Sequence, residues 1–269
     1  MTSSSAHNIT CTIDDGVAQV WLDRPDKLNG LTLDMLGELV AVSKRLRQDR
    51  SLRAVILAGA GESFSAGLDF ASAMRNPARI ARTFVPAPLR GTNTFQEAAW
   101  GWRRLPVPVI AAIKGHCYGG GVQLALGADF RISTPDAQWS VLEAKWGLIP
   151  DMSGIRSLAE VVGMDTAKLL TMTGDTFSGE QARDYGLVTQ LAADPLVEAD
   201  ALAQKLKSRS PDAIAAAKRL FNDTWTSTPR RTFARERAEQ LALLVNANTR
   251  IAREAAFRRE TPVFTARKR

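Results

Sequence analysis

The chain has 269 residues, of which 45% are hydrophobic and 23% are charged, and this length can bury the core of one globular domain. No apolar run is long enough to span a membrane, and no early apolar run precedes a cleavage site. We therefore expect a cytoplasmic protein that does not contact a membrane. Two cysteines are too few for a disulfide framework, and two histidines are too few for a histidine metal site, so we expect no bound metal.

The excess positive charge lies near the end of the chain. Residues 230–269 hold eleven Arg and Lys against four Asp and Glu, whereas residues 1–229 hold equal numbers of each. A basic tail of this kind can bind nucleic acid, bind a small phosphorylated ligand, or form a solvated helical face. Because the tail has few aromatic residues for base stacking, we expect no nucleic-acid partner.

The first half of the chain predicts strands that alternate with helices. Alternating apolar residues around Asp14-Asp15-Gly16 predict a hairpin. We further expect a helix capped by Thr32 and ending near Gln48, a buried strand over 54–57, an irregular and mobile surface segment over 71–92, a helix over 94–104 and a buried strand over 108–113.

The second half becomes helical. We expect short strands over 129–133 and 138–141, a mostly apolar loop over 142–154, helices over 153–162 and 165–172, a short helix capped by Ser178, and helices over 195–208, 211–225 and 229–246. This order predicts an α/β core over 1–195 and a C-terminal helical region over 196–269.

Two glycine turns stand out as candidate sites. Gly115-His116-Cys117-Tyr118-Gly119-Gly120-Gly121 lies between a buried strand and a helix, so its unpaired backbone N–H groups can stabilise a negatively charged oxygen. Ser63-Phe64-Ser65-Ala66-Gly67-Leu68-Asp69-Phe70 follows another strand in the same way. Neither the dinucleotide fingerprint nor the phosphate-loop pattern fits the first stretch. Taken alone, the first stretch is equally compatible with a purely structural turn, and the second is weak evidence for a site.

Together with other short motifs, these turns resemble the enoyl-CoA hydratase/isomerase (crotonase) superfamily over about residues 8–260. Each motif is weak by itself, but all of them in this order are specific. The matching pieces are Arg24-Pro25-Asp26-Lys27-Leu28-Asn29, Phe64-Ser65-Ala66-Gly67-Leu68-Asp69, Pro106-Val107-Pro108-Val109-Ile110-Ala111, Gly119-Gly120-Gly121, Asp129-Phe130-Arg131, Glu143 with Gly147-Leu148-Ile149-Pro150, and Gly186-Leu187-Val188.

The resemblance implies a crotonase-like ββα spiral core with a C-terminal helical trimerisation region, and hence a homotrimer or homohexamer. It implies an acyl-CoA thioester substrate and no separate cofactor, because coenzyme A is part of the substrate. The thioester oxygen would accept hydrogen bonds from the N–H groups of Leu68 and Gly120. The residues that would contact the rest of the substrate are Lys27 near the nucleotide, Ala66, Gly67, Asp69, Gly119, Gln123 and Trp146.

The catalytic positions depart from the hydratase pattern. Hydratases of the family carry two glutamates, and this chain has Gln123 at the first position and Glu143 at the second. An amide cannot exchange a proton at neutral pH. Asp151 stands where dienoyl-CoA isomerases of the family have an aspartate, although those enzymes also carry an aspartate in place of Gln123. We therefore favour double-bond isomerisation by Glu143 and Asp151. The alternatives are a 2-enoyl-CoA hydratase and a non-catalytic acyl-CoA-binding member.

Structural roles compete with these assignments. Asp151 could cap the helix that follows it, Glu143 could form a surface salt bridge, and Gln123 could simply pack in the core. His116 and Cys117 are expected in the core or in a turn. Trp100, Trp102, Trp139 and Trp146 are expected as core residues or as walls of an acyl pocket. If Glu143 is catalytic, its apolar neighbours should raise its pKa by desolvation.

Overall fold

The computed structural model describes residues 8–268, so the N-terminal segment 1–7 and residue 269 lie outside the described residues. A six-stranded sheet has the order β1-β2-β3-β4-β6-β9, in which β1 is antiparallel to β2 and the other neighbours are parallel. Its strands are β1 (Ile9–Asp14), β2 (Val17–Leu22), β3 (Ala54–Gly59), β4 (Val109–Ile113), β6 (Phe130–Ser133) and β9 (Gln190–Leu191). A three-stranded sheet pairs β5 (His116–Tyr118), β7 (Gln138–Ser140) and β8 (Phe177–Ser178).

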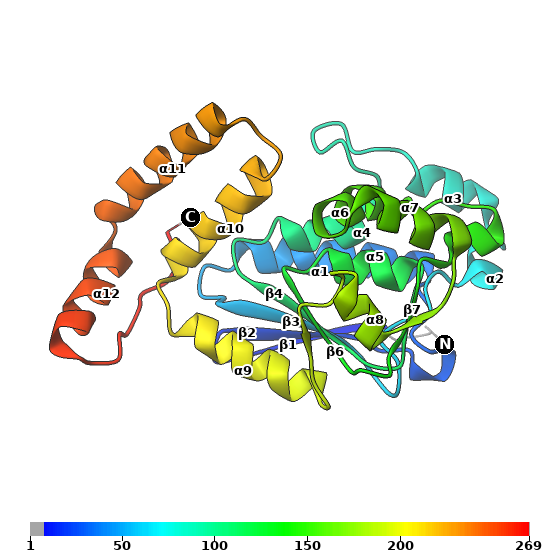
Figure 1. The fold of residues 1–269 in the computed structure, drawn as a ribbon, viewed down its shortest axis with the longest axis horizontal. Helices are drawn as coiled ribbons and strands as arrows, with labels where there is room; N and C mark the ends of the chain where they lie inside the picture. Colours follow the sequence, from blue (N-terminus) through cyan, green and yellow to red (C-terminus); the bar gives the residue numbers. More distant parts are fainter. Residues whose placement is uncertain (1–7, 269) are drawn as a thin grey trace, which may run out of the picture.

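Helices cover both faces of the large sheet (Figure 1). Helices α1 (Leu33–Gln48), α4 (Thr94–Arg103) and α5 (Gly120–Leu126) lie on one face, and α9 (Pro195–Lys207) lies on the other. Every residue of β3 and β4 is buried, which explains why both strands are continuous apolar runs without alternation. The predicted α/β core is confirmed.

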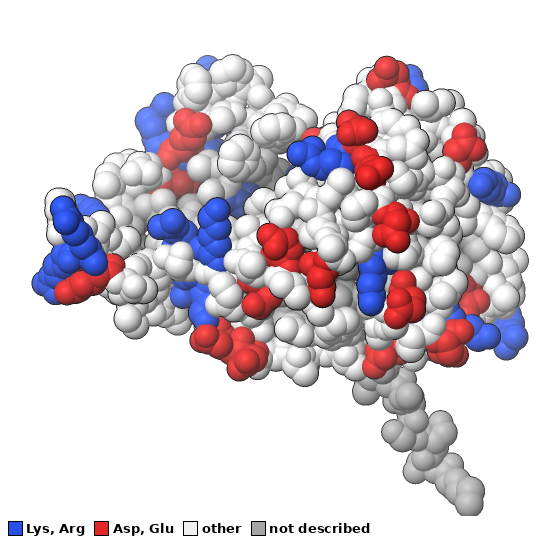
Figure 2. Space-filling view, turned by 60° about the horizontal axis from the view of Figure 1, so that its bottom comes forward, with Lys and Arg blue, Asp and Glu red and all other residues white. Residues whose placement is uncertain are grey.

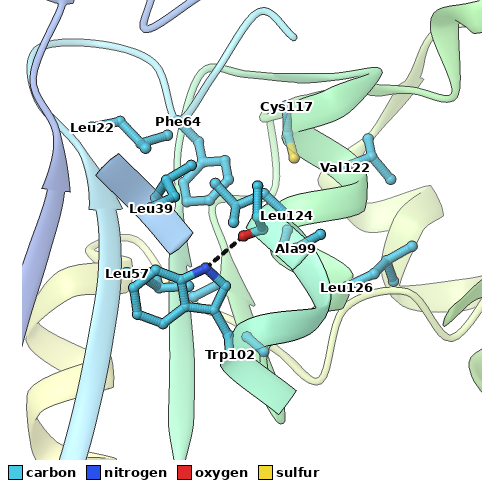
Figure 3. Packing of buried hydrophobic residues seen from close by; sticks show 14 of the residues in the cluster. Leu22, Leu39, Leu57, Phe64, Ala99, Trp102, Cys117, Val122, Leu124 and Leu126 are labelled. Carbon is cyan, nitrogen blue, oxygen red and sulfur yellow. Dashed lines mark hydrogen bonds between the residues drawn. The ribbon is translucent and has the colours of Figure 1, made fainter. Parts of the chain in front are cut away.

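The main core lies between the sheet and helices α1, α4 and α5. Trp102 is fully buried there and donates a hydrogen bond from its indole Nε1 to the carbonyl of Ala98 at 2.8 Å (Figure 3). Leu39, Leu57 and Leu124 pack around it. Trp139 and Cys117 are also fully buried, so these core assignments are confirmed.

Local capping signals identify several helix starts correctly. The Thr32 hydroxyl accepts a hydrogen bond from the N–H of Met35 at 3.2 Å and begins α1. Ser178 begins α8 (Gly179–Asp184) with a capping box in which Gln181 bonds back to the Ser178 N–H. Each cap satisfies backbone groups that a helix end would otherwise leave unpaired.

Two expectations of irregular structure are wrong. The segment 71–92 contains α2 (Phe70–Ala73) and α3 (Pro77–Thr83). Asn76 caps α3 by accepting a hydrogen bond from the N–H of Arg79 at 3.0 Å, and Pro77 occupies the first helical position. Within the loop 142–154, Leu142–Trp146 forms a 3₁₀ helix, η2. A further 3₁₀ helix, η1, spans Pro25–Lys27.

The C-terminal helices extend to one side of the core (Figure 1). The chain continues after α6 (Gly154–Val161) and α7 (Met164–Thr173) to α9, and then to α10 (Pro211–Thr224), α11 (Pro229–Leu244) and α12 (Ala247–Arg258). The helix expected over 229–246 ends two residues early, and Asn246 caps α12. After α12 the chain returns toward α10 (Figure 1). No described helix is both long and apolar enough to span a bilayer.

Candidate active site

The first glycine turn positions the N–H of Leu68. Gly67 has a φ of 88°, a left-handed conformation that glycine adopts without a side-chain clash. The carbonyl of Gly67 accepts a hydrogen bond from the N–H of Leu31 at 2.7 Å, and the N–H of Asp69 donates to the carbonyl of Leu31 at 2.9 Å. These two bonds hold the peptide groups on either side of Leu68, whose own N–H is left over.

The second glycine turn positions the N–H of Gly120 beside that of Leu68. Gly119 has a φ of 48°, and Gly120 is the first residue of α5. A Cβ atom added to Gly120 would lie 3.6 Å from the nitrogen of Leu68, and one added to Gly67 would lie 3.3 Å from the nitrogen of Gly120. Neither N–H donates a hydrogen bond to another residue in the described chain. Two adjacent free donors can stabilise the oxygen of an enolate.

Glu143 is a buried carboxylic acid with one unpartnered oxygen. It lies in η2 with 9% of its surface exposed, and its Oε1 accepts a hydrogen bond from Gln123 Nε2 at 2.6 Å. Its Oε2 is buried and has no hydrogen-bond partner in the described residues. Burial raises the pKa of Glu143, the nearby charge of Asp151 raises it further, and the Gln123 bond opposes the rise. The surface salt-bridge alternative is therefore wrong, and the expected direction of the pKa shift is confirmed.

Gln123 connects Glu143 to the start of α6. Its side chain is 2% exposed, and its Oε1 accepts hydrogen bonds from the N–H of Met152 at 2.7 Å and of Gly154 at 3.0 Å. With Nε2 bonded to Glu143, the orientation of the amide is fixed, because the oxygen faces two donors and the nitrogen faces an acceptor. We call this three-bond arrangement the Gln123 latch.

Asp151 is half-buried beside the same site, and burial raises its pKa. The helix-cap alternative is wrong, because α6 begins at Gly154 and the residue in the capping position is Ser153. Ser153 has a φ of 69° and makes no capping bond with its side chain. The carboxyl group of Asp151 is therefore available to a ligand rather than occupied by a helix end.

A cavity of about 760 Å³ brings these groups together, and we call it the acyl cavity. All eleven site residues predicted from the sequence line it, although their individual roles remain predictions. They are Lys27, Ala66, Gly67, Leu68, Asp69, Gly119, Gly120, Gln123, Glu143, Trp146 and Asp151. Arg24 also lines it and pairs with Asp69 at 2.8 Å, while Asp69 accepts a hydrogen bond from the N–H of Ser72.

The sequence interpretation missed the apolar wall of the acyl cavity. Met74, Ile80 and Phe84 line it from the segment that was expected to be irregular, Phe70 lines it from the residue just before that segment, and Phe95 lines it from α4. The ring of Phe70 stacks on Trp146 at a centroid distance of 5.3 Å, and Phe84 lies 4.8 Å from Phe95. The Asn-Pro start of α3 is the local signal that could have revealed this wall.

The remaining sequence candidates lie away from the acyl cavity. His116 begins strand β5 and is partly buried, and its Nδ1 lies within hydrogen-bond distance of Ser63 Oγ at 2.9 Å, so the expectation of a turn residue is wrong for it. On the face in Figure 2, basic and acidic side chains are interspersed among uncharged ones. Arg267 of the basic tail is 2% exposed and folds back onto its own chain. In residues 8–268, no group of three or more His, Cys, Asp or Glu could hold a metal ion.

Known proteins resemble this chain in both sequence and fold. The family model for enoyl-CoA hydratase/isomerase matches residues 12–265. The carnitinyl-CoA dehydratase of Escherichia coli K12 is 34% identical over 81% of this chain and 82% of its own. The 1,2-epoxyphenylacetyl-CoA isomerase of the same strain is 30% identical over 95% of this chain and 97% of its own. An enoyl-CoA hydratase structure from Mycobacterium tuberculosis H37Rv superimposes with a TM-score of 0.84 at 29% identity, over 96% of this chain and 98% of the other. This chain belongs to the enoyl-CoA hydratase/isomerase family of enzymes.

Proposed function

We propose that this protein moves a double bond within an unsaturated acyl-CoA thioester. The observation that carries the proposal is the placement of two carboxyl groups, Glu143 and Asp151, in one cavity with two free backbone donors. Burial raises the pKa of both carboxyl groups, which brings each closer to the range in which a side chain exchanges protons. Both features suit a reaction that begins and ends with proton transfer to carbon.

In this isomerisation the substrate and the product have the same atoms, and only a proton and a double bond change position. One carboxylate removes a proton from the acyl chain, and the electrons move toward the thioester carbonyl to form an enolate. The N–H groups of Leu68 and Gly120 stabilise the negative oxygen of this enolate. The other carboxylic acid then returns a proton to a carbon further along the chain. Glu143 is the essential proton carrier in this scheme and Asp151 is its partner.

The Gln123 latch argues against hydration through the usual pair of glutamates. The amide of Gln123 cannot accept or release a proton, and all of its bonds already serve Glu143 and the start of α6. One of the two acid–base groups that a hydratase places around its water is therefore replaced by a positioning group. The names of the relatives include both a dehydratase and an isomerase, so they do not choose between the two reactions.

A substrate panel that scores isomerisation and hydration separately tests the proposal. We expect the wild type to isomerise a 3,5-dienoyl-CoA, Glu143→Gln to lose about a hundredfold or more in kcat, and Asp151→Asn to abolish the isomerisation. Asp136→Asn, which changes an exposed carboxylate outside the cavity, serves as the matched control and should retain activity.

Three results would contradict isomerisation. Efficient hydration of crotonyl-CoA without isomerisation of any substrate would establish the 2-enoyl-CoA hydratase alternative. Tight binding of acyl-CoA without turnover would establish the non-catalytic alternative. Full dienoyl-CoA isomerisation by Asp151→Asn would remove Asp151 from the mechanism.

We also propose that the chain assembles as a homotrimer or homohexamer. Helices α11 and α12 and the residues beside them expose large apolar side chains, namely Phe233, Leu241, Leu244, Val245 and Phe257. Exposing several large apolar side chains in one region of the chain is costly in water, and a subunit interface would cover them. Light scattering at micromolar concentration should give a mass of three or six chains, and a stable monomer would contradict the proposal.

A further inference from the structure

A second cavity, of about 910 Å³, lies where α1 and α4 end against α10. We call it the arginine cavity, because seven of its lining residues are basic and only one, Asp223, is acidic. The basic residues are Arg47, Arg50, Arg103, Arg104, Lys218, Arg219 and Arg267. The arginine cavity and the acyl cavity have no lining residue in common.

Four of these cations are already neutralised by the fold. Lys218 pairs with Asp129 at 2.6 Å, and Arg219 pairs with Glu239 at 2.7 Å. Arg103 pairs with Glu160, and Arg104 lies 3.5 Å from Glu97. The acidic lining residue is also occupied, because Asp223 accepts a hydrogen bond from Arg235 at 3.0 Å. These pairs connect the walls of the cavity, and three of the seven basic lining residues, all of them arginines, are outside these pairs.

The three remaining arginines have no carboxylate in contact. Arg47 and Arg50 are exposed, and their side chains make no hydrogen bond or ion pair to the described residues. Arg267 is 2% exposed and donates only to backbone carbonyls, those of Leu52 at 3.2 Å and Asp49 at 3.0 Å. Its Nε–H has no hydrogen-bond partner in the described residues, and the two carbonyl oxygens carry no negative charge with which the guanidinium could form an ion pair.

Charged groups of both signs lie near the guanidinium of Arg267. Burial lowers the pKa of Arg267 most, and the positive charges of Arg219 and Arg50 lower it further. Asp212 and Asp49 raise this pKa by more than those two arginines lower it, although neither carboxylate forms an ion pair with Arg267. A partly enclosed cavity strengthens such interactions relative to open water. An anion in the cavity would therefore meet the side chains of Arg47, Arg50 and Arg267, none of which forms an ion pair within the described residues.

We propose that the arginine cavity binds a polyvalent phosphate anion, for which inorganic pyrophosphate is the simplest probe. Guanidinium groups present a planar fork of N–H donors that matches phosphate oxygens two at a time, and they stay charged at any physiological pH. The recognition rests on phosphate rather than on a nucleobase. The guanidinium of Arg103 already lies 4.8 Å from the ring centre of Trp100, the aromatic side chain in the lining.

Isothermal titration with pyrophosphate at low ionic strength tests this proposal. We expect saturable binding of one pyrophosphate per chain that weakens as salt is added. Arg47→Glu/Arg50→Glu should weaken it at least about tenfold, because hydrogen bonds between charged partners are the strong ones. The matched control is Lys44→Glu/Arg45→Glu, which makes the same charge change at exposed positions on α1 outside the cavity. It should bind within about twofold of the wild type.

A second variant and a second ligand separate this site from the acyl cavity. Lys27→Glu should still bind pyrophosphate, because Lys27 belongs to the acyl cavity. ADP should bind no more tightly than pyrophosphate. Turnover of acyl-CoA by Arg47→Glu/Arg50→Glu should equal that of the wild type, so this proposal can fail without affecting the proposed function. Arg47 and Arg50 are exposed, and matching thermal melts will verify that their variant folds.

Four results would overturn the proposal. The first is the absence of saturable pyrophosphate binding to the wild type. The second is an equal loss of affinity in the two charge-reversal variants. The third is a loss of binding in Lys27→Glu, which would assign the anion to the acyl cavity. The fourth is ADP binding far more tightly than pyrophosphate, which would show that a base is recognised.

Discussion

Replacing Gln123 by Met tests how much the Gln123 latch stabilises the fold around Glu143. Met is unbranched and similar in size, so the change removes the polar atoms with little change in packing. Three buried groups would lose their partners: Glu143 Oε1 and the N–H groups of Met152 and Gly154. A buried polar group left unsatisfied costs about 1–3 kcal/mol. Even at the lower end, three such losses amount to about 3 kcal/mol.

Thermal and denaturant unfolding measure this loss. For a chain of this size, about 1 kcal/mol shifts Tm by roughly 2–4 °C, so we expect Gln123→Met to lower Tm by about 6–12 °C. The matched control is Gln138→Met, at an exposed glutamine on β7, which should change stability by no more than about 0.5 kcal/mol. A Tm for Gln123→Met within about 2 °C of the wild type would refute the idea that the latch stabilises this fold.

Two further predictions concern charge. Lys27→Glu should raise KM for acyl-CoA more than it lowers kcat, because a contact remote from the reacting carbons binds the ground state and the transition state alike. Lys114→Glu changes an exposed lysine and serves as the control. An unchanged KM in Lys27→Glu would remove Lys27 from the site. For Glu143, burial raises the pKa of the folded state, so the wild type is fully stable only below the pKa of the unfolded state and loses stability as pH rises through the folded pKa. Glu143→Gln removes this loss, so its Tm relative to the wild type should increase as the pH rises above about 4, the pKa of an unperturbed glutamate, and a constant difference would contradict the raised pKa.

Local sequence signals predicted the elements that depend on neighbouring residues. The two donor turns were found because each requires glycine at a left-handed position, Gly67 and Gly119. The helix starts at Thr32 and Ser178 were found because capping needs only the next three residues. The order of these motifs along the chain then identified the family, and with it the spiral core.

The features that the sequence did not predict depend on distant partners. The oxygen of Gln123 bonds to N–H groups 29 and 31 residues further along the chain, and no local pattern reports such a pairing. The apolar wall was missed because α2 and α3 are short and α3 is mostly exposed, so they show little of the periodicity that marks a longer helix. The exclusion of Asp151 from helix capping likewise depended on where α6 begins.

The two donors at Leu68 and Gly120 differ in kind from the groups proposed to transfer protons, because the donors are main-chain N–H groups and the proton carriers are side chains. Both donors belong to the main chain, so no side-chain replacement that leaves the two turns intact can delete them. The side chain of Leu68 is consequently free to change with the shape of a substrate while its N–H keeps the same task. In the proposed reaction, the side chains at 123, 143 and 151 can therefore be exchanged one at a time without removing the two donors. New reactions on this scaffold should therefore arise by changing where protons are delivered, with the means of stabilising the intermediate left unaltered.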